Sequence, residues 1–274
     1  RQMCIRDSIK SGMASAMHEL SVISNNVSNA NSNGFKKSLV SFADFAGGIF
    51  PASVQSSANG LGSRIEETRI SDAQGAILST ENKTDMALLG NGFFALQNLS
   101  DNSLSFTRNG AFGLDEQGFL TTADNHRVLG TPIFEDEFGQ IAGNIEALLP
   151  IQIPSVRDDL VMSELQISPD GRISARYGEE EPVPISSLTL GIFSNPVGLK
   201  ELGNARFSAT DRSGLLTLGA PRDPGFADLQ IGGLEISNVN ITEELTAMIK
   251  AQQQFNGSAR LMQANSDMVE KLTR

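Results

Sequence analysis

A regular spacing of apolar residues near the N-terminus constrains this chain more than any other feature of its sequence. From Ile9 onward these residues follow one another at alternating steps of three and four, the heptad spacing of a helix that buries one stripe against a partner helix. The sequence therefore predicts a helix over 9–34 that needs a helical partner. The positions of the stripe are Met13, Ala16, Leu20, Ile23, Val27 and Ala30.

The other faces of this predicted helix carry almost no charge. Between Ser11 and Phe35 the only acidic or basic side chain is Glu19, unless His18 is protonated. Most remaining positions are Ser, Asn, Ala or Gly, where a solvated coiled coil normally carries Glu and Lys. Small uncharged side chains allow close approach, so we interpret this helix as one that packs on more than one side.

A second helix is predicted from Val239 to the C-terminus. Asn240 or Thr242 can cap it, and two glutamates follow in the first turn, where the helix dipole favours negative charge. Leu261 and Met268, seven residues apart, form a further stripe on another face. The main apolar stripe has three-and-four spacing and includes Leu245, Met248, Phe255, Ala259, Met262 and Val269.

Between the two helices the sequence predicts short β-strands separated by turns. Glycine-containing turns between short apolar runs are typical of antiparallel hairpins in a sandwich or barrel. The predicted hairpins join Met86–Leu89 to Phe93–Leu96 through Gly90-Asn91-Gly92, Leu104–Thr107 to Ala111–Leu114 through a type I′ turn at Asn109-Gly110, Ala111–Leu114 to Phe119–Thr122 through Glu116-Gln117-Gly118, and Leu165–Ser168 to Arg172–Ala175 around Pro169-Asp170-Gly171.

These elements predict an α+β fold in which two coiled-coil-like terminal helices pair with each other and flank a mainly antiparallel β domain. The helices over 9–34 and 235–274 form a discontinuous domain, residues 35–62 form a connector, and residues 63–234 form the β domain. Residues 1–8 are predicted to be a non-native extension, because polar side chains stand where the heptad stripe would require apolar ones.

Composition excludes several classes of protein. The formal charge of −11 argues against a nucleic-acid partner, since phosphate contacts need clustered Lys and Arg. The single cysteine, Cys4, excludes an intramolecular disulfide and a cysteine-rich metal site. No apolar run approaches the roughly 20 residues of a transmembrane helix, so no membrane insertion is expected. No cleavable signal peptide is recognised either, so export would need another route.

Candidate catalytic and metal-binding residues are few. His18 has no second His or Cys at ligand spacing, so we assign it a structural or surface role. His126 stands beside turn residues, so we assign it to a surface loop. Neither a nucleophile-elbow motif nor a metalloprotease motif or a phosphate-binding loop occurs. The sequence therefore predicts a protein that is not an enzyme, with no catalytic residue, cofactor or metal site.

Heptad stripes of this length also occur in monomers that simply pair two helices. The uncharged faces of the first helix and the second stripe at Leu261 and Met268 would, however, remain in water in such a monomer. We therefore expect self-assembly.

Segments at both ends and in the middle of the chain resemble bacterial flagellar axial proteins, the rod and hook family. The segment LSVISNNVSNANSNGFKKS is similar to the family's N-terminal signature, LEISNVNITEELTAMIKAQQQFNGSARLMQANSDMV to its closing segment, and ALLGNGFFAL with FTRNGAFGLDEQGFL to its β domain. Phe255 departs from the Tyr of many members but keeps the ring. The matched motif residues are Asn25, Asn26, Asn29, Asn31, Gly34, Phe35, Lys36, Ser237, Asn238 and Val239.

The resemblance implies a structural subunit of the flagellar basal-body rod, where it crosses the periplasm. Its terminal helices would assemble helically with copies of itself and with other axial proteins, and the assembly would transmit torque. Such subunits are exported unfolded by the flagellar type III apparatus, without a cleaved signal peptide.

Two alternatives remain open at this stage. One is a flagellar hook protein, because SFADFAG after the first helix is similar to hook sequences. The other, from a different class, is a trimeric coiled-coil adhesin or a phage-tail-type fibre protein, which also has helical ends and a β centre.

Overall fold

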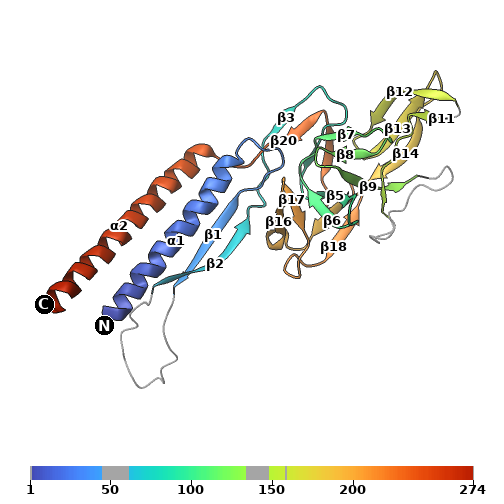
Figure 1. Ribbon diagram of the computed structural model, residues 1–274. Coiled ribbons are helices and arrows are strands. Elements are labelled where there is room, and N and C mark those ends of the chain that lie inside the picture. The colour runs from blue at the N-terminus through green and yellow to red at the C-terminus, as the bar shows by residue number, and fades with distance from the viewer. Residues whose placement is uncertain (1, 45–61, 134–147, 158, 274) are drawn as a thin grey trace. The chain divides into compact units, whose positions relative to one another are not determined.

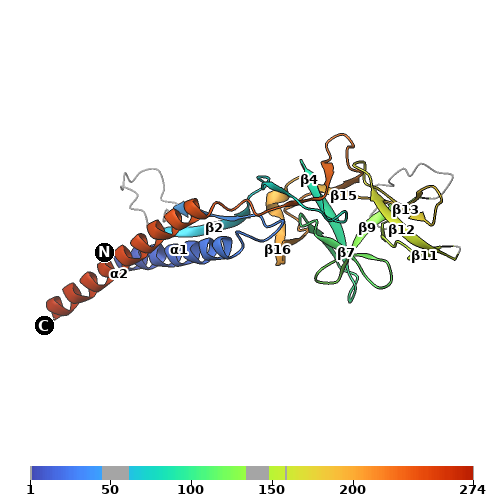
Figure 2. The same cartoon turned by 90° about the horizontal axis from the view of Figure 1, so that it is seen from above.

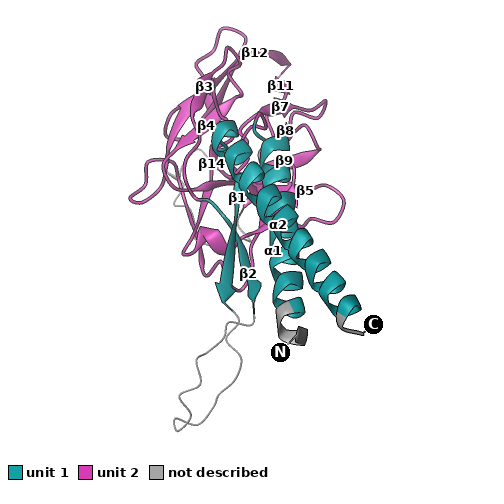
Figure 3. Cartoon of the chain, turned by 90° about the vertical axis from the view of Figure 1, so that its left-hand side faces the viewer, with its two compact units in different colours: residues 1–30, 37–71, 239–274 teal, residues 31–36, 72–238 magenta. Residues whose placement is uncertain are grey.

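The computed structural model describes residues 2–44, 62–133, 148–157 and 159–273, which form two compact units. Unit 1 comprises residues 1–30, 37–71 and 239–274, and unit 2 comprises residues 31–36 and 72–238 (Figure 3). Both units are therefore discontinuous in sequence.

Two long helices dominate unit 1. Helix α1 spans Gln2–Ser28 and helix α2 spans Ile241–Thr273, and they lie side by side and antiparallel (Figures 1 and 2). Asn240 caps α2, since its Oδ1 accepts a hydrogen bond from the backbone N–H of Thr242 at 3.0 Å. The predicted pairing of the two chain ends is confirmed. Residues 2–8 continue α1, and their non-native origin stays a prediction that sequencing the native gene would test.

A β-hairpin completes unit 1, and the sequence did not predict it. Strand β1 (Ser38–Asp44) pairs antiparallel with β2 (Ser63–Ile70), with an irregularity between Ser41 and Phe42. Residues 38–44 thus form a strand where a connector was expected, and β2 belongs to unit 1 instead of the β domain. β1 ends at Asp44 and β2 begins at Ser63, so the two strands lie too far apart in sequence for the two-residue turn that usually signals a hairpin.

Unit 2 is built almost entirely of antiparallel strands. One large sheet has the order β11-β12-β13-β14-β9-β5-β6-β17-β16, with β7, β8, β10, β15 and β18 attached to it, while β19 pairs with β4 and β20 with β3. Together with the helices of unit 1, this arrangement confirms the predicted α+β fold class. A short 3₁₀ helix, η2 (Pro196–Gly198), lies in one connection. The strands are β3 (Ile77–Ser79), β4 (Met86–Leu89), β5 (Phe93–Asn98), β6 (Leu104–Thr107), β7 (Phe112–Leu114), β8 (Leu120–Thr122), β9 (His126–Pro132), β10 (Leu149–Pro150), β11 (Val156–Arg157), β12 (Leu160–Ile167), β13 (Arg172–Tyr177), β14 (Val183–Leu188), β15 (Leu190–Phe193), β16 (Lys200–Gly203), β17 (Arg206–Ser208), β18 (Leu216–Gly219), β19 (Asp228–Ile231) and β20 (Gly233–Glu235).

Two of the four predicted hairpins are confirmed and two are wrong. β7 pairs with β8 and β12 with β13, as predicted. β4 pairs with β19 instead of β5, and β6 pairs with β5 and β17 instead of β7. A Cβ at Gly110 would overlap the backbone oxygen of Met86. This glycine therefore permits a close approach between strands, and the Asn109-Gly110 pair makes no type I′ turn.

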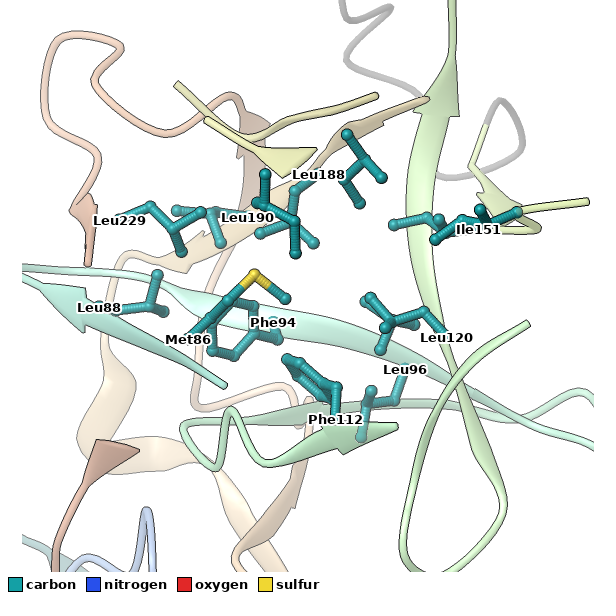
Figure 4. Packing of buried hydrophobic residues seen from close by; sticks show 14 of the residues in the cluster. Met86, Leu88, Phe94, Leu96, Phe112, Leu120, Ile151, Leu188, Leu190 and Leu229 are labelled. Carbon is teal, nitrogen blue, oxygen red and sulfur yellow. The ribbon is translucent and has the colours of Figure 1, made fainter. Parts of the chain in front are cut away.

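The core of unit 2 lies between strands that are distant in sequence. Phe94 and Phe112 pack edge to face, with ring centroids 5.0 Å apart. Figure 4 shows their side chains beside Met86 and among leucines from several strands. Strands β4 and β5 carry consecutive buried residues, as expected of strands covered on both faces, whereas β13 alternates buried residues with more exposed ones. Other members of the core are Leu88, Leu96, Leu120, Ile151, Leu188, Leu190 and Leu229.

Candidate functional site

The predicted stripe of α1 is shielded from solvent. Ala16 is fully buried and Ile23 nearly so. None of the other four positions is exposed, and Gly12 approaches the hydroxyl of Ser258 on α2. The half-buried positions are Met13, Leu20, Val27 and Ala30.

The predicted stripe of α2 only partly coincides with its shielded face. Met248, Phe255, Ala259 and Met262 are half-buried, and the most buried positions of the helix are Ala251 and Glu244. Leu245 and Val269, by contrast, are 45% and 39% exposed. Leu245 follows Glu244 by one residue, about 100° around the helix, so it stands beside the seam with α1. The structure thus brings together four of the six predicted residues of α2.

Helix α1 has a second neighbour, the β1–β2 hairpin. Ser15 Oγ lies 3.0 Å from Ser63 Oγ, and His18 Nε2 lies 3.1 Å from Thr68 Oγ1. These contacts confirm that α1 packs on more than one side. They also give His18 a structural role, as the sequence predicted.

Asn26 joins three elements of unit 1. Its Nδ2 donates to the carbonyl oxygen of Ser38 at 2.9 Å, and its Oδ1 accepts from the Ser38 N–H at 2.9 Å. Nδ2 also donates to Glu244 Oε2 at 3.1 Å. Glu244 in turn lies 3.9 Å from Lys37 Nζ. One amide side chain therefore holds α1, β1 and α2 together.

We expect Asn26→Ala to lower the free energy of unfolding of unit 1 by about 2–3 kcal/mol, because it leaves buried backbone groups of Ser38 without partners. Chemical denaturation followed by helical circular dichroism measures this loss. Asn25→Ala is the matched control, since Asn25 is exposed. Equal losses in the two variants would contradict the assignment.

The other asparagines of the N-terminal motif play smaller parts. Asn29 Nδ2 donates to the backbone and side-chain oxygens of Asn25 at 3.0 Å, which covers carbonyl groups where α1 ends. Asn31 is exposed. In the C-terminal motif, Ser237 is buried and Val239 half-buried.

A buried cluster of three charged side chains lies in unit 2. It consists of Lys36, Arg108 and Glu235, whose side chains are 1–2% exposed. Glu235 accepts from Lys36 Nζ at 2.7 Å through Oε1 and from Arg108 Nη1 at 3.2 Å through Oε2. We call these three residues the charged cluster. It contains two cations and one anion, so the remaining donors need neutral acceptors.

Backbone groups supply most of the remaining partners. Lys36 Nζ donates to Ala73 O at 2.8 Å, and Arg108 Nη2 donates to Gly90 O at 2.6 Å. Burial lowers the pKa of the Lys36 ammonium group, an effect that the carboxylate of Glu235 opposes. The Arg108 guanidinium also lies 5.3 Å from the ring centroid of Phe93.

The cluster explains the glycine of the Gly34-Phe35-Lys36 motif. The Gly34 N–H donates to the backbone oxygen of Glu235 at 2.7 Å. Gly34 has a φ of 69°, and a Cβ there would overlap the backbone nitrogen of Asn109. Only glycine combines this backbone conformation with so close an approach.

Three family models match this chain. They describe a flagella basal body rod protein over residues 9–36, a flagellar hook protein FlgE/F/G D1 domain over 87–175 and a flagellar basal body rod FlgEFG protein C-terminal region over 230–274. Among its relatives, a flagellar basal-body rod protein FlgG of Borreliella burgdorferi is 30% identical, covering 94% of this chain and 93% of the relative. The FlgG of Buchnera aphidicola (subsp. Acyrthosiphon pisum) is 32% identical over 97% and 96% of the two chains. That of Bacillus subtilis is 30% identical over 96% and 95%.

The chain belongs to the flagellar basal-body rod protein family. It is a structural subunit of the rod, as the resemblance implied. The matched segments at residues 9–36 and 230–274 contain Lys36 and Glu235, two members of the charged cluster. The third, Arg108, lies in the matched β region.

Sequence reasoning missed Arg108 and Glu235 in this rod subunit. Glu235 is the one acidic residue in the apolar run Leu234-Glu235-Ile236, and that position was a usable signal for a buried partner. Its partner Lys36 is 199 residues away, so no local pattern connects the two residues.

A second polar cluster of the rod subunit corrects the assignment of His126 to a surface loop. His126 begins β9 and is buried. Its Nδ1 lies 2.9 Å from the backbone oxygen of Asp124, and its Nε2 accepts a hydrogen bond from Arg206 Nη1. The carboxylate of Asp124 lies 3.0 Å from Arg206 Nε and accepts from Thr122 Oγ1 at 2.6 Å. Strand β17 brings Arg206 to the turn before His126, which is 80 residues earlier in the sequence. The polar residues around His126 therefore gave no sign that its side chain is buried.

This second cluster predicts a pH dependence of stability. Desolvation of the Asp124 carboxyl raises its pKa, but the surrounding hydrogen bonds and charges, led by the hydrogen bond from Thr122 and the charge of Arg206, outweigh that effect and lower the pKa. A carboxyl with a lowered folded-state pKa stabilises the fold above its unfolded-state pKa, and this stabilisation is lost as the pH falls through the folded-state value. We expect Asp124→Asn to lower the free energy of unfolding by about 1 kcal/mol at neutral pH. The difference between the variant and the wild type should shrink below about pH 3.9. Urea unfolding of both proteins over a range of pH measures this difference in stability. A difference that does not change with pH would contradict the prediction.

Two further observations concern metals and membranes. Within residues 2–44, 62–133, 148–157 and 159–273, no group of three or more His, Cys, Asp or Glu is arranged to hold a metal ion. Within the same ranges, neither helix combines the length and the apolarity needed to span a membrane.

Proposed function

We propose that this rod subunit assembles helically through unit 1 and that the assembly transmits torque. Its partners are copies of itself and other flagellar axial proteins. The proposed role is structural and not catalytic. The proposed assembly element is formed by the two stripes, Met13, Ala16, Leu20, Ile23, Val27, Ala30, Leu245, Met248, Phe255, Ala259, Met262 and Val269.

The observation that carries this proposal is the exposed apolar surface of α2. Ile241, Leu245 and Ile249 recur every four residues and are 45–55% exposed. Leu261 and Met268, on another face, are about 60% exposed. Apolar surface favours burial by about 25 cal/mol for each Å² removed from water. Repeated over the length of one helix, it supports contacts with neighbouring copies.

The faces of α1 support the same role. Met17 is 59% exposed on a helix that carries little charge between Ser11 and Phe35. Small side chains without charge allow neighbouring helices to approach closely without desolvating ions. α1 therefore offers a surface on which an apolar stripe from another copy can pack.

We also propose that the subunit reaches the rod, which crosses the periplasm, through the flagellar export apparatus as an unfolded chain without a cleaved signal peptide. The separation of the two helices in sequence supports this proposal, because the pair can form only after both ends of the chain have arrived. Mass spectrometry of subunits isolated from basal bodies tests it. An N-terminus shortened by cleavage of a leader would contradict it.

Electron microscopy of the purified protein, with and without residues 9–34, tests the assembly itself. We expect helical polymers from the full chain and none after the truncation. Compact trimers that survive the truncation would overturn the proposal and favour a trimeric fibre protein.

A further inference from the structure

Two residues of the charged cluster, Lys36 and Glu235, stand on segments of unit 2 that border the points where the chain changes unit. The chain crosses at 30/31, 36/37, 71/72 and 238/239. The residues of unit 2 next to these crossings belong to three segments: 31–36, 72–76 and 235–238. All of them contribute a partner to the network around Glu235.

Hydrogen bonds around Glu235 fasten these three segments to one another. Glu235 Oε1 accepts from Lys36 Nζ and, at 2.9 Å, from the N–H of Gly75. The backbone oxygen of Glu235 accepts from Gly34. The Ile236 N–H donates to Ala76 O at 2.9 Å.

A second set of bonds converges on the 72–76 segment. Ala73 O accepts from Lys36 Nζ and, at 2.8 Å, from Asn238 Nδ2. One backbone oxygen thus holds the segment that leaves for β1 and the segment that leaves for α2. Arg108 then fastens Glu235 to the turn between β4 and β5, because it also donates to Gly90 O.

We propose that the charged cluster is a clamp that transmits force, fixing the chain crossings as one rigid block within unit 2. Each neutral hydrogen bond contributes modestly, but bonds to buried charges are stronger and demand defined geometry. Separating one partner from a buried ion pair leaves an uncompensated charge, which is costly. The block therefore resists displacements that would pull these side chains apart. This inference rests on the proposed function, because a clamp that transmits force has a role only in an assembly that transmits torque.

Three other ion pairs among the described residues of unit 2 have a different placement. Lys83 and Glu164, 2.8 Å apart, are 66% and 47% exposed, and Arg222 and Asp228 are also exposed. The pair of Asp124 and Arg206 is half-buried and joins the turn before β9 to β17, and neither residue belongs to the three segments next to the crossings. It therefore supplies a matched control for general loss of stability.

The test compares Glu235→Gln with Asp124→Asn in the full chain. Glutamine keeps the size of the side chain and removes the charge that Lys36 and Arg108 share. Native-state amide hydrogen exchange of the purified protein is measured at Gly34, Gly75, Ile236 and Asn238. We expect exchange there to accelerate at least about tenfold in Glu235→Gln and to stay near the wild-type rate in Asp124→Asn.

Bending of assembled rods is the second measurement. In electron micrographs of rods purified from cells that carry each variant, we expect a persistence length reduced at least about twofold for Glu235→Gln and unchanged for Asp124→Asn. If Glu235→Gln does not fold, Lys36→Met replaces it in both measurements, because this variant keeps the pair of Glu235 and Arg108. We expect the same acceleration of exchange and the same reduction in persistence length.

The outcomes separate the clamp from the assembly. Exchange that rises uniformly over unit 2, or rods as stiff as the wild type, would overturn the clamp while leaving the assembly intact. Local acceleration of exchange in Glu235→Gln, together with a wild-type chain that never forms rods, would instead overturn the proposed assembly. Local acceleration together with flexible rods supports the clamp.

Discussion

Replacing Glu235 by leucine is expected to lower the free energy of unfolding of unit 2 by about 3–5 kcal/mol, because two buried cations lose their common counterion. The side chains of Lys36 and Arg108 are each 2% exposed, so water cannot replace the carboxylate without opening the fold. The N–H of Gly75 loses its acceptor as well. Denaturant unfolding followed by the near-ultraviolet signal of the aromatic side chains measures the loss.

Glu179→Leu provides the control for the Glu235 prediction. Glu179 is exposed in the loop after β13, and a surface substitution of this kind is worth within about 0.5 kcal/mol. A loss below about 1 kcal/mol for Glu235→Leu would contradict a tightly held ionic cluster.

Leu245→Asp is expected to abolish motility while leaving the folded monomer intact. Leu245 is 45% exposed beside the helix seam, so an aspartate there remains hydrated in the monomer. Buried against a neighbouring copy, the same carboxylate would cost several kcal/mol. Repetition of this cost in every subunit would prevent growth of the rod. Swimming in soft agar and counts of complete basal bodies measure the effect.

Two further variants define the Leu245 prediction. Leu245→Met keeps an apolar side chain of similar volume and is expected to swim normally. Leu20→Asp, on the shielded stripe of α1, is expected to abolish motility without unfolding the β domain. Normal swimming with Leu245→Asp would show that this stripe of α2 meets water in the rod as well.

Much of the helical unit could be predicted because its signals are local. Heptad spacing repeats within a few turns, and Asn240 with its two following glutamates specifies where α2 begins. Leu245 and Val269 of the predicted α2 stripe nevertheless lie outside the shielded face of the helix. Apolarity alone does not distinguish a side chain that faces α1 from one that faces outward, and the seam accepts small Ala251 and the polar Glu244.

The sequence predicted that the middle of the chain forms short antiparallel strands, but it did not predict which strands pair with one another. The turns at Gly118 and Gly171 join neighbouring strands as expected. Gly90-Asn91-Gly92 and Asn109-Gly110 carry the same signal, yet their flanking strands pair with partners elsewhere in the sequence. Glycine marks both a tight turn and a close approach of two backbones, and only the tertiary structure separates these uses.

The sequence by itself determined the two paired helices, the mainly antiparallel β domain between them and the family. Each depends on periodicity or on motifs that lie within a few tens of residues. Only the tertiary structure decided that β1 and β2 pack on α1, and that Lys36, Arg108 and Glu235 meet. The physical reason is that a buried ion is costly unless partners compensate its charge. Folding brings those partners together from positions 199 residues apart, and no spacing rule encodes such a meeting.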